Sequence, residues 1–276
     1  TGWIQMYACD HQQIIDSVLQ AFAIAEAVSI PVMVCYDGYL LSHTYMPFEV
    51  PEEEQVRCFL PPFKPAYALD PRDPANLNTV TLPDVRMDVE GEMAHGYMEI
   101  RYLLQEDLRA TLTVAQETEG RFARIFGRGG NALLEPHRCD DAEYIVVGLG
   151  SLTYQLRDVV ETLRGEGLKV GVLGIRLYRP FPDEAVVKVL RNARGVFVIE
   201  KALSYGYEGA LCSDVKAALY TCRGDGAGAD AAGGLLTDRS GGTQGGGSCA
   251  DGPFVRGLIA GIGGRDIRTA DLADTL

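Results

Sequence analysis

The chain has 276 residues, of which 47% are hydrophobic and 23% are charged, and its formal net charge is −13. This length is enough for two ordinary domains with full hydrophobic cores. The acidic balance argues against nucleic acid and anionic membranes as partners, and no apolar run reaches the roughly 18 residues of a membrane helix, so the sequence predicts a globular, cytoplasmic protein.

The first predicted elements are a helix and a strand. Residues 10–29 have Asp10 as an N-cap and an apolar stripe at helical spacing, which predicts an amphipathic helix. The stripe consists of Ile14, Val18, Phe22 and Ala25. Residues 31–36 are a continuous apolar run that ends at Asp37 and Gly38, a pattern typical of a buried parallel strand.

A proline-rich segment and a long helix follow. Eight of the 13 prolines fall within residues 47–83, and because proline fixes φ and blocks regular pairing, this segment is interpreted as a stiff surface linker. A short acidic helix around residues 52–60 interrupts it. Apolar residues at nearly helical spacing from 97 to 126 predict a helix of about 30 residues, bent at Gly120, that straps two domains together.

The second half of the chain alternates strands and helices. A strand at 144–151 runs through a Gly-x-Gly-Ser turn into a helix at 152–165, and further strands and a helix follow to residue 199. This alternation predicts a parallel sheet with right-handed crossovers. Residues 223–253 are rich in Gly, Ala and Asp, and they are interpreted as a mobile insertion.

Two glycine turns in this half resemble anion-binding loops. The turn at Gly148 precedes a helix, but Thr153 occupies the third glycine position of the dinucleotide fingerprint, so we interpret it as a tight turn with Ser151 as helix cap. The second loop, near the end of the chain, contains Gly263 and Arg265. It is interpreted as structural turn chemistry.

The loop after the first strand contains a more specific candidate site. Asp37, Gly38, Ser42 and His43 lie just beyond the carboxyl end of that strand, where open α/β sheets bind ligands. The alternative is a loop histidine that bonds to its own backbone or to a neighbouring subunit. The sequence leaves both open.

The segment at 174–182, GIRLYRPFP, forms a corner before a helix. Pro180 and Pro182 shape this corner, and the acidic residues that follow suit a helix start. Arg176 and Arg179 have two interpretations: they bind a carboxylate of another domain or subunit, or they lie on a plain surface.

Cysteine and histidine spacing predicts no metal site. The seven cysteines contain no Cys-x-x-Cys pair, and none of the four histidines has a neighbour at metal-ligand spacing. This pattern is not typical of a disulfide framework, a zinc site or an iron–sulfur cluster. Reduced thiols are therefore expected.

Several ordered blocks resemble one enzyme family. They include TGWIQMYACDHQQ, IAEAVSIPVMVCYDGYLLSHT, FLPPFKPAYALDP, GIRLYRPFP and GIGGRD. Their order and spacing resemble the alpha subunit of the pyruvate:ferredoxin oxidoreductases, in the 2-oxoacid:ferredoxin oxidoreductase family. The resemblance extends over nearly the whole chain except residues 223–253.

The resemblance implies a domain organisation. Residues 1–46 would be the last part of a thiamine diphosphate pyrimidine-binding domain, 47–127 the linker and long connecting helix, and 128–276 a parallel-sheet domain like the carboxyl-terminal domain of transketolase. The family's pyrimidine-activating glutamate, and its substrate-contacting threonine and arginine, would precede Thr1. No catalytic residue is therefore assigned here, and this polypeptide alone is expected to be inactive.

The resemblance also implies an activity. Thiamine diphosphate with Mg²⁺ would support decarboxylation of a 2-oxo acid, taken as pyruvate, to acetyl-CoA and CO2 with coenzyme A. Electrons would pass through iron–sulfur clusters on beta-, gamma- and delta-type partner subunits to ferredoxin. Residues 1–127 carry 8 basic and 19 acidic groups, a net charge of −11, so an acidic ferredoxin is expected to dock elsewhere.

Site roles follow from the same resemblance. The loop of Asp37, Gly38, Ser42 and His43 would be cofactor-proximal or at an interface. Structural or interface roles would fall to Arg176, Arg179, Pro180, Pro182, Gly263 and Arg265. Two alternatives remain: another thiamine diphosphate enzyme chain, of the transketolase or pyruvate dehydrogenase E1 beta type, and a non-catalytic scaffold subunit.

Overall fold

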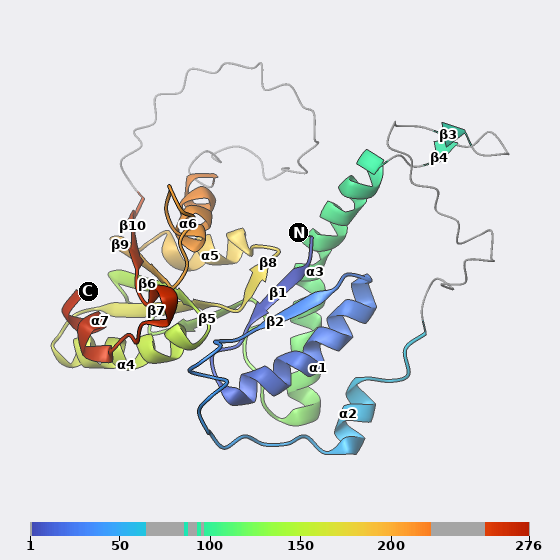
Figure 1. The fold of residues 1–276 in the computed structure, drawn as a ribbon, viewed down its shortest axis with the longest axis horizontal. Helices are drawn as coiled ribbons and strands as arrows, with labels where there is room; N and C mark the ends of the chain where they lie inside the picture. Colours follow the sequence, from blue (N-terminus) through green and yellow to red (C-terminus); the bar gives the residue numbers. More distant parts are fainter. Residues whose placement is uncertain (1, 65–85, 88–92, 95–96, 222–251, 276) are drawn as a thin grey trace. The chain divides into compact units, whose positions relative to one another are not determined.

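The computed structural model describes residues 2–64, 86–87, 93–94, 97–221 and 252–275 (Figure 1). It has an α/β fold, as predicted, and two compact units. The first unit combines Thr1–Glu135 with Ile175–Pro182, and the second combines Pro136–Gly174 with Asp183–Leu276. Most of the predicted insertion at 223–253, and the part of the predicted linker at 65–85, lie outside the described residues.

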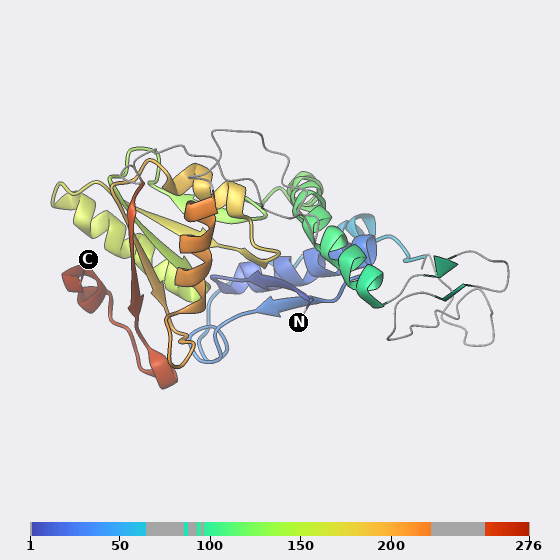
Figure 2. The same ribbon diagram turned by 90° about the horizontal axis from the view of Figure 1, so that it is seen from above.

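The first unit contains a three-stranded sheet of order β2-β1-β8, in which β8 is Leu177–Arg179. Strands β1 (Ile4–Tyr7) and β2 (Val32–Cys35) run parallel (Figure 2). In their register Tyr7 is paired with Cys35. Helix α1 (His11–Val28) connects them, and the Asp10 carboxylate accepts a hydrogen bond from its first turn, from Gln13 N at 2.8 Å. The predicted helix, its cap and the parallel pairing of the following strand are confirmed. The prediction that this strand is buried was wrong: β2 lies at the edge of the described sheet, its residues are only half-buried, and Met33 is 41% exposed.

The apolar stripe of α1 is not its buried face. Val18 is 40% exposed and Phe22 57% exposed, whereas Asp16, Ser17 and Gln20 are buried. Arg128 makes the burial of Asp16 favourable, since its guanidinium donates to both carboxylate oxygens at 2.8 and 3.1 Å. The helix was predictable from its own sequence, but its orientation depends on a partner about a hundred residues away.

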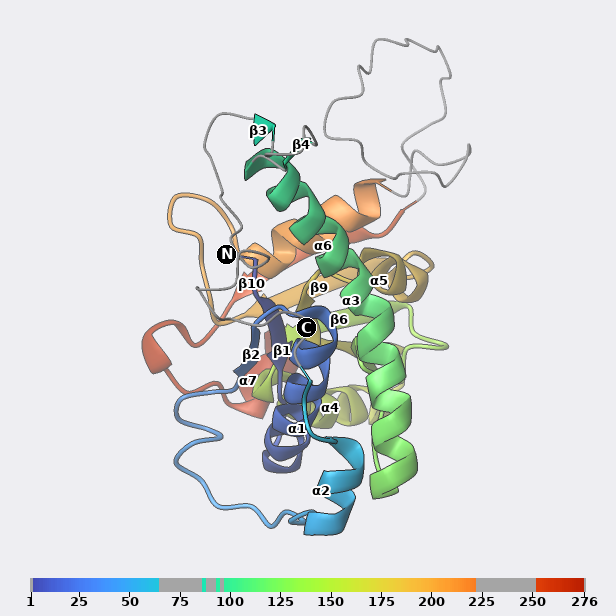
Figure 3. The same cartoon turned by 90° about the vertical axis from the view of Figure 1, so that its right-hand side faces the viewer.

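Helices α2 (Glu53–Phe59) and α3 (Tyr97–Phe126) complete the first unit, and a two-stranded ribbon of β3 (Arg86–Met87) and β4 (Met93–Ala94) precedes α3. The long helix has 30 residues, as predicted, and it packs along α1 (Figure 3). An aromatic cluster of Phe59, Phe122 and Phe126 fixes α2 on α3, with ring centroids 4.3 to 5.7 Å apart. All of α3 therefore belongs to the first unit, whereas the sequence suggested a strap between domains.

A glycine inside α3 offers a simple stability test. Gly120 is exposed, and a Cβ at this position would meet no atom within 4 Å. Because alanine loses less backbone entropy than glycine on forming a helix, Gly120→Ala should raise the free energy of unfolding by about 0.5–1 kcal/mol. Urea unfolding followed by circular dichroism measures this; a lower urea midpoint would contradict it.

The second unit is built on a five-stranded sheet of order β10-β9-β6-β7-β5, in which β6, β9 and β10 are parallel. The strands are β5 (Leu134–His137), β6 (Tyr144–Leu149), β7 (Val170–Ile175), β9 (Gly195–Glu200) and β10 (Phe254–Ile259). The helices are α4 (Ser151–Gly165), α5 (Asp183–Leu190), α6 (Ala210–Thr221), the 3-10 turn η2 (Ile262–Gly264) and α7 (Thr269–Thr275). A buried apolar cluster joins α4 and α7 to β6 and β7, and α5 packs with α6. The predicted alternation of strands and helices is confirmed.

The corner segment differs from its predicted place. The sequence assigned 174–182 to a domain of residues 128–276, but β8 (Leu177–Arg179) pairs antiparallel with β1 in the first unit. A backbone bond from Tyr7 N to Arg176 O, 2.7 Å long, supports this pairing. Its cause is non-local, because the partner strand lies some 170 positions earlier in the chain.

Candidate functional site

The carboxyl ends of the parallel strands β1 and β2 meet at one edge of the first unit. β1 ends at Tyr7 and leads within three residues into α1, while β2 ends at Cys35 and leads into the loop predicted as a site. Tyr7 and Cys35 face each other in register, and both are half-buried. Parallel sheets bind ligands at this kind of edge.

The two central side chains of the edge are neutral at neutral pH. Burial raises the pKa of the Tyr7 phenol above its ordinary value, and the adjacent Cys35 thiol raises it further, while Arg179 acts in the opposite direction. Burial also raises the pKa of Cys35. The pair therefore offers hydrogen-bonding groups to a ligand, and not a thiolate nucleophile.

Aromatic rings continue this edge into the corner segment. The rings of Tyr7 and Tyr178 meet edge to face with centroids 6.0 Å apart, and Phe181 meets Tyr178 in the same way at 6.2 Å. The Arg179 guanidinium lies 4.0 Å from the Tyr178 ring centroid and donates to the Tyr178 carbonyl at 2.9 Å. Arg179 is thus half-buried on an aromatic platform. Pro182 directly precedes α5, as its helix-start pattern predicted.

The predicted loop divides into two parts. Asp37 is close enough to Tyr7 to raise its pKa. Ser42 Oγ donates to Gly38 O at 2.5 Å and lies 2.7 Å from Nδ1 of His43, whose exposed ring stacks on Tyr39. The structure therefore brings Asp37 to the strand edge and fastens His43 within its own loop.

Polar residues at the start of α1 hold this loop. Gln12 forms a double amide contact with the backbone of Glu49, donating to its carbonyl at 3.2 Å and accepting from its N–H at 2.6 Å. His11 Nε2 lies 3.2 Å from Thr44 O. Sequence reasoning missed both residues, and the only signal was the polar run directly after the helix cap. The fastened loop leaves several aromatic side chains exposed: Tyr36, Tyr39, Tyr45 and Phe48.

Arg176 lies inside the first unit. Its Nη1 donates to Glu119 Oε2 of α3 at 2.9 Å, and its Nη2 donates to Gln20 Oε1 of α1 at 2.9 Å. The side chains of Arg176 and Glu119 are only 4% and 5% exposed. Arg176 is therefore not on a plain surface. It does bind a carboxylate, but this carboxylate belongs to the same unit and not, as the sequence suggested, to another domain or subunit.

The glycine turns of the second unit include glycines with positive φ. Gly150 has φ 59° and ψ −142° before α4, so glycine itself is the N-cap and Ser151 is the first helical residue. The predicted Ser151 cap was wrong, because this backbone conformation favours a residue without a side chain. Thr153 is 1% exposed and packs against Gly148. Gly263 has φ 70°, and Arg265 lies near enough to Asp271 to lower the pKa of that carboxyl, after the larger effect of Arg268.

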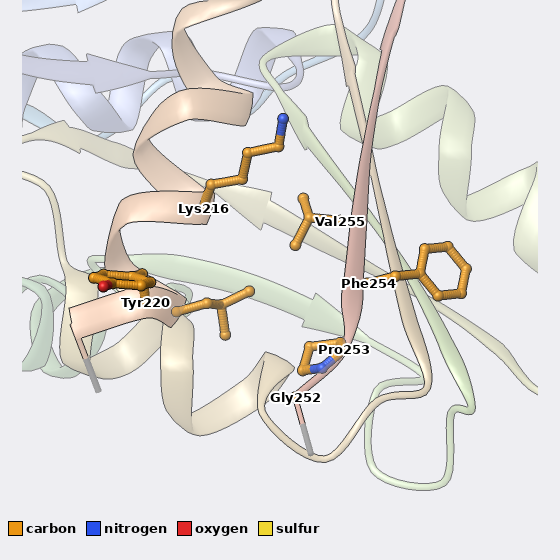
Figure 4. A pocket seen from close by; sticks show the side chains of 7 residues that line it. Lys216, Tyr220, Gly252, Pro253, Phe254 and Val255 are labelled. Carbon is orange, nitrogen blue, oxygen red and sulfur yellow. The ribbon is translucent and has the colours of Figure 1, made fainter. Parts of the chain in front are cut away.

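A hollow of about 400 Å³ lies between α6 and β10 (Figure 4). Its described lining includes Leu219, Tyr220, Pro253 and Val255. Lys216 also lines it, and the ammonium of this lysine is paired with Glu208. None of the residues predicted as sites lines it.

None of the described helices combines the length and the hydrophobicity of a membrane-spanning segment. Within the described ranges, no group of three or more His, Cys, Asp or Glu side chains is placed to hold a metal ion.

Known proteins and family models show the family of this chain. Residues 1–107 match the family "Pyruvate flavodoxin/ferredoxin oxidoreductase, thiamine diP-bdg", and residues 142–234 match "Pyruvate:ferredoxin oxidoreductase core domain II". Pyruvate synthase subunit PorA of Methanothermobacter thermautotrophicus is 35% identical over 276 residues, covering 99% of this chain and 61% of the relative. The chain belongs to the pyruvate:ferredoxin oxidoreductase family. The predicted resemblance is confirmed.

Two further proteins extend this comparison. Ketoisovalerate oxidoreductase subunit VorA of Pyrococcus abyssi is 33% identical over 99% of this chain and 60% of its own length. The solved 2-oxoglutarate:ferredoxin oxidoreductase from Magnetococcus marinus aligns with a TM-score of 0.52 at 15% identity, over 99% of this chain and 41% of that chain, and shows a shared fold. The chain spans about 61% of the length of the PorA relative.

Proposed function

We propose that this chain is the alpha-subunit portion of a thiamine diphosphate-dependent 2-oxo acid:ferredoxin oxidoreductase that acts on pyruvate. The reaction converts pyruvate and coenzyme A to acetyl-CoA and CO2 and reduces ferredoxin. The match of residues 1–107 to a thiamine diphosphate-binding family carries this proposal. Relatives named for pyruvate favour that substrate, and the VorA relative makes ketoisovalerate the second candidate.

The edge formed by β1 and β2 fits the pyrimidine half of the cofactor. Tyr7 and Cys35 offer neutral hydrogen-bonding groups beside the Tyr178 ring, a combination suited to a flat, polar heterocycle. When bound, the thiazolium supplies the electron sink for decarboxylation. In this proposal Asp37 and Gly38 lie closest to the cofactor, while Ser42 and His43 form the outer, interface part of the same loop.

The remaining components come from partners. We assign the diphosphate with its Mg²⁺, and the iron–sulfur clusters, to beta-, gamma- and delta-type subunits of one cytoplasmic complex. Ferredoxin docks on one of those subunits, because residues 1–127 carry a net charge of −11 and would repel an acidic partner. The exposed aromatic loop, Arg179, Pro180, Gly263 and Arg265 are proposed as structural or interface residues.

Anaerobic purification of the native complex tests this function. We expect coenzyme A-dependent reduction of ferredoxin or viologen with pyruvate, lost when thiamine diphosphate is removed and restored when it is added back. Assays with pyruvate, ketoisovalerate and 2-oxoglutarate measure the substrate preference. We expect the kcat/KM for pyruvate to be at least about tenfold higher than that for either other acid. Reduction that needs no thiamine diphosphate, or full activity of this polypeptide alone, would contradict the proposal.

A further inference from the structure

Arg176 joins four parts of the first unit. Its guanidinium binds Glu119 of α3 and Gln20 of α1, both at 2.9 Å, and lies 3.4 Å from the Asn131 carbonyl after α3. Its own carbonyl accepts the Tyr7 N–H at 2.7 Å. Arg176 therefore connects helices α1 and α3 directly to the carboxyl end of β1.

Stability alone does not explain this network. A buried ion pair gains little net stability, since desolvation of both charges offsets their attraction. The surroundings also leave polar groups unsatisfied: Ser17 Oγ, Gln20 Nε2 and Arg176 Nε are buried without a hydrogen-bond partner. Apolar residues of similar volume would avoid these penalties, so the network is better explained by the geometry that it fixes.

That geometry leads to the candidate site. The planar guanidinium binds two helices at once, which fixes the Arg176 backbone, and the backbone bond then fixes Tyr7 at the last position of β1. Tyr7 in turn faces Cys35 of β2. We propose that Arg176 is a positioning residue that holds the Tyr7–Cys35 edge in place for the pyrimidine half of thiamine diphosphate. This inference rests on the proposed function.

The test uses the intact native complex. Arg176→Met combined with Glu119→Gln removes both charges, while the amide oxygen of glutamine keeps an acceptor for the Gly130 N–H. We expect the complex to assemble with a midpoint of thermal unfolding within about 3 °C of the wild type. Its Kd for thiamine diphosphate, measured by calorimetry in the presence of Mg²⁺ after cofactor removal, should rise at least about tenfold.

Two further variants keep the inference falsifiable. Arg176→Lys retains the charge but not the planar fork, so its Kd should lie between those of the wild type and the double variant. Arg164→Met with Asp141→Leu removes an ion pair of 2.6 Å in the second unit and should leave the Kd within about twofold of the wild type.

The outcomes separate this inference from the proposed function. A Kd within about twofold of the wild type in an assembled double variant would overturn the role of Arg176, as would an equal rise in the control pair. If the double variant does not assemble, an unchanged Kd for thiamine diphosphate in Arg176→Lys would overturn the role of Arg176. A wild-type complex that does not bind thiamine diphosphate would refute the proposed function itself.

Discussion

Replacing Glu119 by alanine should lower the free energy of unfolding by about 3–5 kcal/mol. Glu119 and Arg176 are 5% and 4% exposed and 2.9 Å apart, so the substitution leaves a buried guanidinium without its counter-charge. Glu119 Oε1 also accepts the backbone N–H of Gly130 at 2.6 Å, and that donor would lose its partner too. Urea unfolding at neutral pH, followed by circular dichroism, measures the change.

A second glutamate in the same helix provides the control. Glu106 pairs with Arg109 at 2.9 Å, but both side chains are more than 40% exposed. Solvent screens such a pair, so Glu106→Ala should change the free energy of unfolding by no more than about 0.5 kcal/mol. Equal effects of the two substitutions would show that burial of the Arg176 pair does not matter for stability.

Local sequence patterns predicted those elements that depend on neighbours along the chain. The helix Tyr97–Phe126 has the predicted length because its apolar spacing continues over eight turns. The start of α1 at Asp10 and the end of β2 before Asp37 follow from capping and turn chemistry in the same short stretches.

Features that depend on distant partners were not predictable. Nothing near Gln20 or Asp16 shows that these polar residues are buried, because their partners, Arg176 and Arg128, lie more than a hundred positions away. For the same reason, the corner segment 174–182 was assigned to the second domain, although Ile175–Pro182 belongs to the first unit. Its pairing with β1 is antiparallel and short, and it produces no hydrophobic periodicity that the sequence would show.

The candidate site follows the same division. The loop of Asp37 to His43 was predictable, since it follows a recognisable strand, and the internal contacts of Ser42 and His43 are local. Tyr7 was not singled out, because its significance comes from its register with Cys35 and its contact with the Tyr178 ring. A side chain becomes part of such an edge through strand pairing, which a single sequence does not reveal.

Replacing Gly209 by alanine should destabilise the second unit by about 3 kcal/mol or more. A Cβ on Gly209 would lie 1.7 Å from Oε1 of Glu200, a side chain that is only 4% exposed. The Glu200 carboxylate accepts the N–H groups of Leu211 and Cys212, both at 3.0 Å, at the start of α6. The substitution displaces this carboxylate, and each lost charge-assisted bond contributes about 1.5–3 kcal/mol.

The pH dependence of this effect identifies its cause. Burial raises the pKa of Glu200 above its ordinary value, so the folded state binds the proton more tightly than the unfolded state does. Stability from this group is therefore present below the ordinary pKa and declines as pH rises towards the raised value. Displacement of the Glu200 carboxylate removes that dependence. The difference in free energy of unfolding between the wild type and Gly209→Ala should therefore be larger at about pH 4.5 than at pH 7. Gly120→Ala makes the same chemical change in open space and should stabilise at both pH values. If this difference in free energy of unfolding does not change with pH, the new methyl group acts on the backbone and leaves the Glu200 side chain in place.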